Sequence, residues 1–131
     1  MAAAESYPDD LKYHREHDWA RLEGDEAVCG VTWFAQDALG ELVHFEAPSA
    51  GDTATMDTPY GEVESVKAVS DVIAPLSGEI LEVNQKVVDA PETVNADPYG
   101  DGWLIRIRMS DPTEVDTLLD VAAYKQFLSE Q

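Results

Sequence analysis

Short runs in which apolar and polar residues alternate, separated by turn-forming residues, make up most of this chain. They predict strands over 13–22, 27–32, 41–46, 61–66, 68–74, 79–83 and 103–109. The first two flank Glu23, Gly24 and Asp25, whose composition suits a tight hairpin turn. Short strands at this spacing are typical of a sandwich or barrel built from antiparallel hairpins.

Helix signals are fewer. Thr32 is placed to cap a helix over 33–39, and Gly40 is placed to end it. The segment 89–95 permits one helical turn, while 97–102 is rich in turn formers. We expect both of these segments to be surface connections.

The C-terminal part of the chain changes to a helical pattern. Asp111, Pro112 and Glu114 form a helix start. Two sets of apolar residues follow at helical spacing, namely Val115, Leu118 and Leu119, and then Tyr124, Phe127 and Leu128. The sequence therefore predicts a mostly β body with short helices, including C-terminal helices.

A chain of 131 residues suits one domain with its own core. We expect residues 1–10, which are small and acidic with a proline, to form a flexible leader to a single domain over 11–131. The chain has neither a basic, apolar targeting segment nor a window of about 20 apolar residues. These features predict a cytoplasmic protein without a membrane partner, or a mitochondrial matrix protein only if a transit peptide has been removed.

Acidic residues far outnumber basic ones, since 27 Asp and Glu against 8 Lys and Arg give a formal net charge of −19. Such a surface repels phosphate backbones and anionic membranes, so nucleic acid is excluded as a partner. The apolar fraction of 44% places this charge on a folded domain and not on a disordered chain. Two explanations of the charge stay open, electrostatic steering toward basic partners and adaptation to a salty or crowded cytosol.

Residues that often carry catalysis or bind metals form no recognisable site. Cys29 is the only cysteine and has small or apolar neighbours, so we interpret it as a reduced core thiol. His14 and His17 lie three apart on a predicted strand and would face opposite sides, which argues against a metal site. A calcium loop counted from Asn95 would need an acid where Arg106 stands. Motifs for nucleotide binding, zinc binding or a serine nucleophile do not occur.

Lys67 is the exception, because it stands where a hairpin must turn. Two similar stretches, 61–66 and 68–73, flank this residue, which is one of only four lysines. One interpretation is a solvated turn lysine. The other is a lysine displayed for covalent attachment of a group-carrying cofactor, which needs an exposed amine on a rigid turn.

The segment 61–68, Gly-Glu-Val-Glu-Ser-Val-Lys-Ala, resembles the lipoyl-lysine hairpin of the glycine cleavage H-protein family. Biotin carriers have methionine on both sides of their lysine, and lipoyl domains of 2-oxo acid dehydrogenases have aspartate before it, where Val66 stands here. The family also has a glutamate three residues before the lysine and a glycine eleven residues after it. Glu64 and Gly78 occupy these positions, and the resemblance implies that they serve recognition by the modifying enzyme.

The resemblance extends from about Leu11 to Leu128. Four further blocks carry it, at 11–19, 30–36, 74–84 and 94–104. Isolated lipoyl domains are shorter and lack these blocks. The implied fold is a barrel-sandwich hybrid, the hairpin sandwich of lipoyl and biotinyl carriers, with short helices.

Similarity to this family implies a carrier without an active site of its own, with lipoic acid in amide linkage to Lys67. The arm would take an aminomethyl group from the glycine decarboxylase (P-protein), pass it to the aminomethyltransferase (T-protein) and be reoxidised by the dihydrolipoamide dehydrogenase (L-protein). A lipoate ligase or lipoyl synthase would supply the modification, and the carrier would be a monomer. An alternative within the same fold is an H-like protein that donates or relays lipoate to other lipoyl-dependent complexes.

The aminomethyl cargo carries a positive charge, which carboxylates can hold through charge-assisted hydrogen bonds in a cleft that limits water. The resemblance implies this role for Asp18, where the family usually has glutamate, and for Asp71, four residues after the lysine. Glu16 stands where the family often has a small hydroxyl residue. It is a candidate to compensate for the shorter side chain of Asp18.

Overall fold

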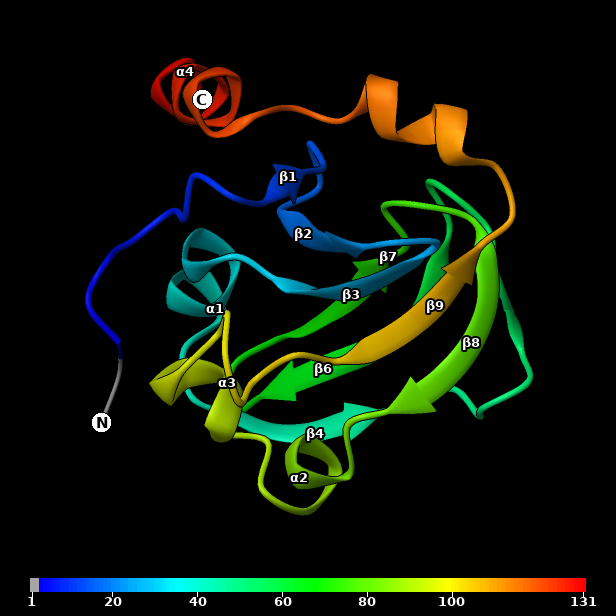
Figure 1. The fold of residues 1–131 in the computed structure, drawn as a ribbon. Coiled ribbons are helices and arrows are strands. Elements are labelled where there is room, and N and C mark those ends of the chain that lie inside the picture. The colour runs from blue at the N-terminus through cyan, green and yellow to red at the C-terminus, as the bar shows by residue number, and fades with distance from the viewer. Residues whose placement is uncertain (1–2) are drawn as a thin grey trace.

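Two antiparallel sheets form the body of the molecule in the computed structural model, which describes residues 3–131 (Figure 1). The larger sheet has the strand order β1-β2-β3-β9-β8-β5, and the smaller sheet has the order β4-β6-β7. The strands are β1 (Lys12–Tyr13), β2 (Asp18–Glu23), β3 (Glu26–Val31), β4 (Leu42–Glu46), β5 (Thr53–Ala54), β6 (Pro59–Ser65), β7 (Val69–Ile73), β8 (Gly78–Val83) and β9 (Ile105–Met109). The predicted mostly β sandwich is confirmed, and its sheets do not close into a barrel.

Short helices lie around the sandwich (Figure 1). α1 (Trp33–Leu39) begins after Thr32, whose hydroxyl accepts a hydrogen bond from the Ala35 N–H, and it ends at Gly40, where φ is +85°. Both the bounds and the caps of this helix agree with the sequence prediction. The other helices are α2 (Gln85–Asp89), α3 (Thr93–Ala96), the 3-10 helix η1 (Pro112–Thr117) and α4 (Val121–Ser129).

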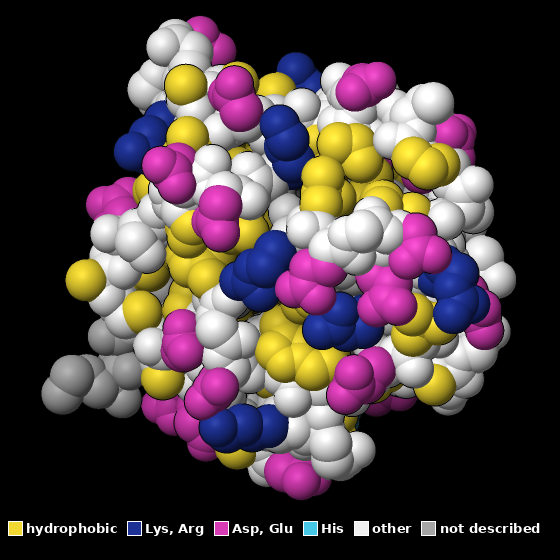
Figure 2. Space-filling view, in the orientation of Figure 1, with side chains coloured by type: hydrophobic (Ala, Val, Ile, Leu, Met, Phe, Trp, Pro, Cys, Tyr) yellow, Lys and Arg dark blue, Asp and Glu magenta, His cyan; other side chains and the backbone are white. Residues whose placement is uncertain are grey.

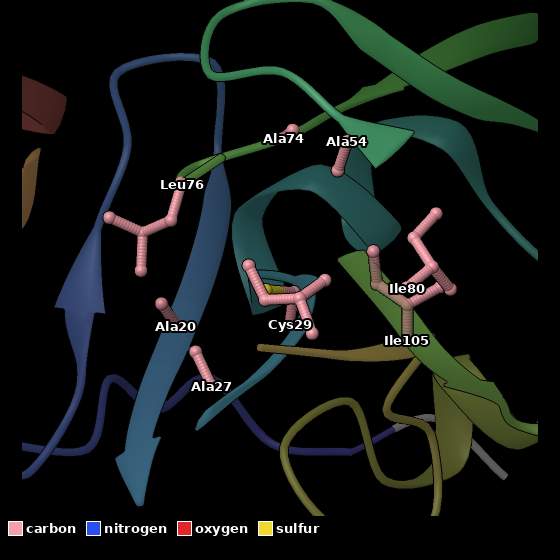
Figure 3. Packing of buried hydrophobic residues seen from close by; sticks show 9 residues of the cluster. Ala20, Ala27, Cys29, Ala54, Ala74, Leu76, Ile80 and Ile105 are labelled. Carbon is pink, nitrogen blue, oxygen red and sulfur yellow. The ribbon is translucent and has the colours of Figure 1, made fainter. Parts of the chain in front are cut away.

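Mostly small or β-branched side chains line the inner face of the larger sheet and the chain packed against it. This cluster contains Ala20, Ala27, Cys29, Ala54, Ala74, Leu76, Ile80, Ile105 and Ile107 (Figure 3). A second cluster includes Phe45, Val63 and Val72 of the smaller sheet. Cys29 is a free and fully buried thiol, as the sequence predicts.

A third, aromatic cluster fastens the C-terminal helix to the larger sheet. Tyr13 of β1 stacks on Tyr124 of α4, with ring centroids 4.6 Å apart and 6° between the ring planes. Trp19 lies flat against Gly30 of the neighbouring strand, where a Cβ would come within 2.7 Å of the indole ring. The glycine therefore leaves the space that the indole fills.

The first predicted strand, 13–22, is in fact two strands joined by a tight turn. The His14 N–H donates to the Asp18 carbonyl at 2.8 Å, and the His17 N–H donates to the His14 carbonyl at 3.0 Å. His17 has φ +71°, a left-handed conformation that breaks the strand. The apolar alternation on both sides conceals this turn from a search for periodicity.

The first C-terminal helix is shorter and tighter than the sequence predicts. η1 ends before Leu118, and Leu119 leaves the helical pattern to form an isolated β-bridge with Tyr13. Each of these two residues donates its N–H to the carbonyl of the other at 2.8 Å. The long-range pairing replaces the helical hydrogen bonds that local spacing favours.

The connection between β8 and β9 is more deeply buried than the sequence predicts. α2 was not expected, and neither was the short edge strand β5, which pairs with β8. Val94, Asn95 and Tyr99 of the expected surface segments are buried. The Asn95 side chain accepts a hydrogen bond from the Leu42 N–H and donates to the Gln36 side chain and the Gly40 carbonyl, each at 2.9 Å.

Residues 3–10, expected to be a flexible leader, contain no helix or strand but are hydrogen-bonded to the body. The Ala3 N–H donates to the Asn95 carbonyl at 2.8 Å, and the Ala3 carbonyl accepts from the Trp33 indole at 2.8 Å. The Tyr99 hydroxyl donates to the Ser6 carbonyl at 2.7 Å. These partners are distant in sequence, so composition alone gives no sign of them.

Charges alternate across the outer face of the larger sheet. Arg106 of β9 lies 2.7 Å from Glu23 and 3.3 Å from Glu26, and Arg108 lies 3.2 Å from Glu79. Figure 2 shows Lys and Arg side chains set among Asp and Glu side chains on one face of the molecule. Each exposed pair contributes at most about 1 kcal/mol, but together they neutralise part of the acidic surface.

Gly78→Ala tests the close approach of β8 and β9. A Cβ at this position would overlap the Arg108 carbonyl oxygen, which belongs to the backbone and cannot rotate away. We expect a loss of about 3 kcal/mol or more in the free energy of unfolding, measured by urea denaturation.

Gly24→Asn is the matched control, because Gly24 has φ +67° and open space around its Cα. Asparagine tolerates this conformation, so a loss below about 1 kcal/mol is expected. Equal stability of the Gly78→Ala variant and the wild-type protein would contradict the close approach of Gly78 to the Arg108 carbonyl.

Candidate functional site

The β6–β7 hairpin carries Lys67 at its tip, as the sequence predicts. Residues along its strands alternate between core and solvent. Val63 and Val72 are each 1% exposed, whereas Glu62 and Glu64 point outward and are exposed. The alternation anchors the hairpin in the core and leaves its turn in solvent.

Ser65 organises the turn that presents the lysine. Its N–H donates to the Ala68 carbonyl at 2.8 Å, which closes a loop with Val66 and Lys67 in the middle. Its hydroxyl oxygen accepts from the N–H groups of Lys67 at 3.3 Å and Ala68 at 3.2 Å. Val66 is 88% exposed. The turn is therefore fixed from inside while its two central side chains are free.

The Lys67 side chain is exposed and lies toward the end of α1. Its Cε is 3.7 Å from the position that a Cβ would take on Gly40. Among residues 3–131, no carboxylate oxygen lies within 4.0 Å of its amine. The amine is therefore available for an acylating enzyme.

Exposed carboxylates are concentrated on the smaller sheet, which includes both strands of this hairpin. Glu46, Glu62 and Asp71 are opposite one another on β4, β6 and β7, and all three are exposed. Like charges in register across strands oppose sheet pairing. Gly40 also borders a groove of about 470 Å³, which is lined by Asp37, Glu41, Glu92, Asp97 and Asp101 together with Lys86 and several uncharged residues. Lys67 is therefore a cation in strongly acidic surroundings.

Asp18 is buried, in contrast to a carboxylate that would line an open cleft. Its side chain is 1% exposed and accepts one hydrogen bond, from the Ile73 N–H at 3.3 Å. Burial raises the pKa of Asp18 well above its usual value of 3.8; the Ile73 hydrogen bond lowers it and the nearby Glu16 charge adds to the rise. The carboxyl thus joins the start of β2 to the end of β7.

Glu16 and Asp71, the other two acids implied by the resemblance, are exposed. Glu16 lies in the turn between β1 and β2, close enough to Asp18 for its charge to affect the Asp18 pKa. Asp71 lies on β7, two residues before the Ile73 N–H that contacts Asp18. The three acids share the region where this turn meets β7, but only Glu16 and Asp71 face solvent.

Glu64 and Gly78 lie at different places in the sandwich. Glu64 is exposed next to the hairpin tip, opposite Val69 in the β6–β7 pairing. Gly78 begins β8 and pairs with Met109 and Ala54. Its lack of a side chain is explained locally by the close approach of the Arg108 carbonyl.

The two histidines do not converge on a common ligand. Both lie in the β1–β2 turn and not on one strand, which corrects the geometry expected from sequence. His14 Nε2 is 2.6 Å from Asp57, and His17 Nδ1 is 2.8 Å from the Tyr124 hydroxyl. Within residues 3–131, no group of three or more His, Cys, Asp or Glu side chains could hold a metal ion.

Comparison with known proteins decides what the hairpin belongs to. A family model described as Glycine cleavage H-protein matches residues 11–131. The chain belongs to the glycine cleavage H-protein family. It is 52% identical over 124 residues to the glycine cleavage system H protein of Anaeromyxobacter sp. (strain K), covering 95% of this chain and 97% of that protein. The corresponding protein of Symbiobacterium thermophilum is 50% identical over 123 residues, covering 94% and 96%.

A solved structure of the family shares the fold. The crystal structure of a glycine cleavage system H protein from Mycobacterium marinum matches with a TM-score of 0.87 and 40% identity, covering 94% of this chain and 99% of that one. Glycine cleavage H-proteins are non-catalytic subunits that carry lipoate covalently on a lysine. This H-protein is accordingly a lipoyl carrier that works with the other components of glycine cleavage.

Two features of the H-protein site could not be found from sequence. Gly40 looks like a helix stop, but it also lies beside the Lys67 side chain. Tyr60 looks like a core residue, but its hydroxyl is buried without a protein hydrogen-bond partner among the described residues. No local sequence pattern indicates either feature.

No helix within residues 3–131 is long and apolar enough to cross a membrane.

Asp18→Asn tests the burial of the Asp18 carboxyl through its effect on stability. A raised pKa means that the folded protein keeps the proton after the unfolded chain has lost it, so stability falls as pH rises from about 3.8 to the folded pKa. Asparagine cannot ionise and can still accept from the Ile73 N–H. The variant should equal the wild-type protein at low pH and exceed it at neutral pH, by about 1.4 kcal/mol for each unit of pKa elevation.

Urea denaturation at a series of pH values measures this difference. Asp25→Asn, a change in an exposed turn between β2 and β3, is the control and should show no such trend. A pH-independent difference between the Asp18→Asn variant and the wild-type protein would show that the carboxyl is solvated.

Proposed function

We propose that Lys67 is the residue that carries lipoate, in amide linkage to its Nζ. The observation that carries this proposal is the hairpin tip, where a turn fixed by Ser65 presents an exposed amine without an ion-pair partner within residues 3–131. Lipoate supplies a dithiolane that accepts the cargo and the electrons. The rigid turn supplies a fixed pivot, so the reach of the arm is set by the arm alone.

We further propose that residues 11–131 form one carrier domain, which the extent of the family match supports. As a shuttle, it would receive the aminomethyl group at the P-protein, deliver it at the T-protein and be reoxidised at the L-protein. A lipoate ligase, or lipoyl synthase, would supply the arm. A monomer in the cytoplasm suits this role, because the same tip must enter several active sites in turn.

We also propose that Asp71 and Glu16 hold the positively charged cargo when the arm folds back along β7. Both are exposed: Asp71 lies on the edge strand β7, which follows the lysine turn, and Glu16 lies two residues before Asp18, the residue that contacts β7. A carboxylate and an ammonium form a charge-assisted hydrogen bond. Asp18, which is buried, supports β7 by accepting a hydrogen bond from the Ile73 N–H. The proposed role of Glu64 is recognition by the modifying enzyme, since this residue is exposed beside the tip.

Lys67→Arg tests the attachment site. The variant keeps the charge and the turn but lacks an acylatable amine, so we expect no lipoyl mass gain with a lipoate ligase, lipoate and ATP. The wild-type protein should gain one lipoyl group, located on Lys67 by peptide mass mapping. Lys125→Arg, on the surface of α4, is the matched control and should be modified as completely as wild type. Modification of the Lys67→Arg variant would place the site elsewhere.

Asp71→Asn tests the cargo-holding role. An exposed ion pair contributes about 0.2–1 kcal/mol, so the lifetime of the aminomethyl-loaded carrier should fall up to about fivefold. The lifetime is measured as release of ammonia and formaldehyde from loaded protein at low salt, with Asp25→Asn as the charge-matched control. If the two variants lose cargo at the same rate, Asp71 has no part in holding it.

A further inference from the structure

The Tyr60 hydroxyl and the Asp18 carboxyl are buried polar groups whose environment the carrier role leaves unexplained. The Tyr60 hydroxyl is enclosed and has no protein hydrogen-bond partner among residues 3–131. The Asp18 carboxyl is 1% exposed and accepts a single hydrogen bond, at 3.3 Å from the Ile73 N–H. Buried polar groups are rarely left unpaired, because their loss of water costs folding free energy.

The two side chains lie in the same part of the core. Tyr60 follows Pro59 on β6, and Pro59 is the cross-strand partner of Ile73, whose N–H donates to Asp18. The charge of Asp18 is close enough to Tyr60 to contribute to the raised pKa of its hydroxyl, although burial is the larger cause. An unpaired donor on β6 and an incompletely paired acceptor on β2 therefore approach the same residue, Ile73 of β7, from the two sheets.

We propose that Tyr60 is a positioning residue for Asp18 and that one enclosed water joins them, accepting a hydrogen bond from the Tyr60 hydroxyl and donating one to the Asp18 carboxyl. The Ile73 N–H uses one carboxyl oxygen, Oδ1, so the other is available. An enclosed water would have the hydroxyl and the carboxyl as partners, together with the buried Cys29 thiol nearby.

Among the described polar groups near Asp18, only the Tyr60 hydroxyl is a strong hydrogen-bond donor that is not already engaged. Glu16 comes from the β1–β2 turn, Cys29 from β3, Tyr124 from α4 and the Ile73 N–H from β7. The Tyr124 hydroxyl is already engaged by His17 and Thr32, at 2.8 and 2.9 Å. Glu16 is an acid, and a thiol is a weak donor.

This contact links three strands at the base of the lysine hairpin. Asp18 belongs to the larger sheet, whereas Tyr60 and Ile73 belong to the two strands of the hairpin. A single buried carboxyl thereby fixes the hairpin relative to the larger sheet. The inference rests on the proposed function only for the role of this hairpin, which carries the cofactor on Lys67.

The test is the titration of Asp18 in Tyr60→Phe protein, followed by the carboxyl ¹³C shift in aspartate-labelled samples. A donor favours the charged carboxylate, so its removal should raise the Asp18 midpoint by roughly one pH unit. Tyr99→Phe is the matched control, because its hydroxyl is engaged by the Trp33 N–H and the Ser6 carbonyl. This control should leave the midpoint unchanged.

A crystal structure of the wild-type protein at high resolution should show an ordered water within hydrogen-bond distance of both the Tyr60 hydroxyl and the Asp18 carboxyl, and its absence would overturn the proposal. An unchanged Asp18 midpoint in Tyr60→Phe protein, or an equal shift in the Tyr99→Phe control, would overturn the proposal. Lipoylation of the same samples is followed by mass. Failure at Lys67 would therefore appear in the mass alone, and failure of the Tyr60 contact would appear in the titration alone.

Discussion

Alternation of buried and exposed residues along β6 and β7 is the constraint on which the carrier site depends. Val63 and Val72 are buried, so the strands between the core and the tip have no freedom to change register. A shift of one residue in strand register would expose both valines to solvent and bury the glutamates on either side of Val63. The turn that carries Lys67 is therefore fixed by residues that never contact the cofactor.

The turn that carries Lys67 also depends on a contact between its hairpin and the larger sheet. Asp18 is placed by its strand β2, whose Trp19 belongs to the same buried cluster as Tyr13 and the aromatic residues of α4. Its carboxyl reaches the edge strand β7, where a backbone N–H would otherwise lack a partner in the sheet. The resemblance implies a longer glutamate at this position, whereas here the shorter side chain remains in the core. The carboxyl that the resemblance assigns to cargo thus serves first as a link between the two sheets.

Sequence reasoning succeeded where the determining contacts are local. The helix 33–39 has both its caps within one residue of its ends, and the lysine hairpin has its turn between two alternating strands. It failed where the partner is distant in the chain. The bridge from Leu119 to Tyr13 and the three hydrogen bonds of the Asn95 side chain join segments more than 50 residues apart, and no local pattern encodes them. The burial of Asp18 belongs to this second group, because it follows from how the sheets pack.

The distribution of charge is as informative as its total. The arginines of β9 are paired with glutamates across the larger sheet, whereas β4, β6 and β7 contain neither Lys nor Arg. Instead, Glu46, Glu62 and Asp71 oppose one another on three neighbouring strands, an arrangement that costs stability. Uniform hydration in a salty cytosol does not require such segregation. Segregation of this kind is what electrostatic steering of the lysine tip toward a basic surface would need, because the field would then be strongest on the face that presents the arm.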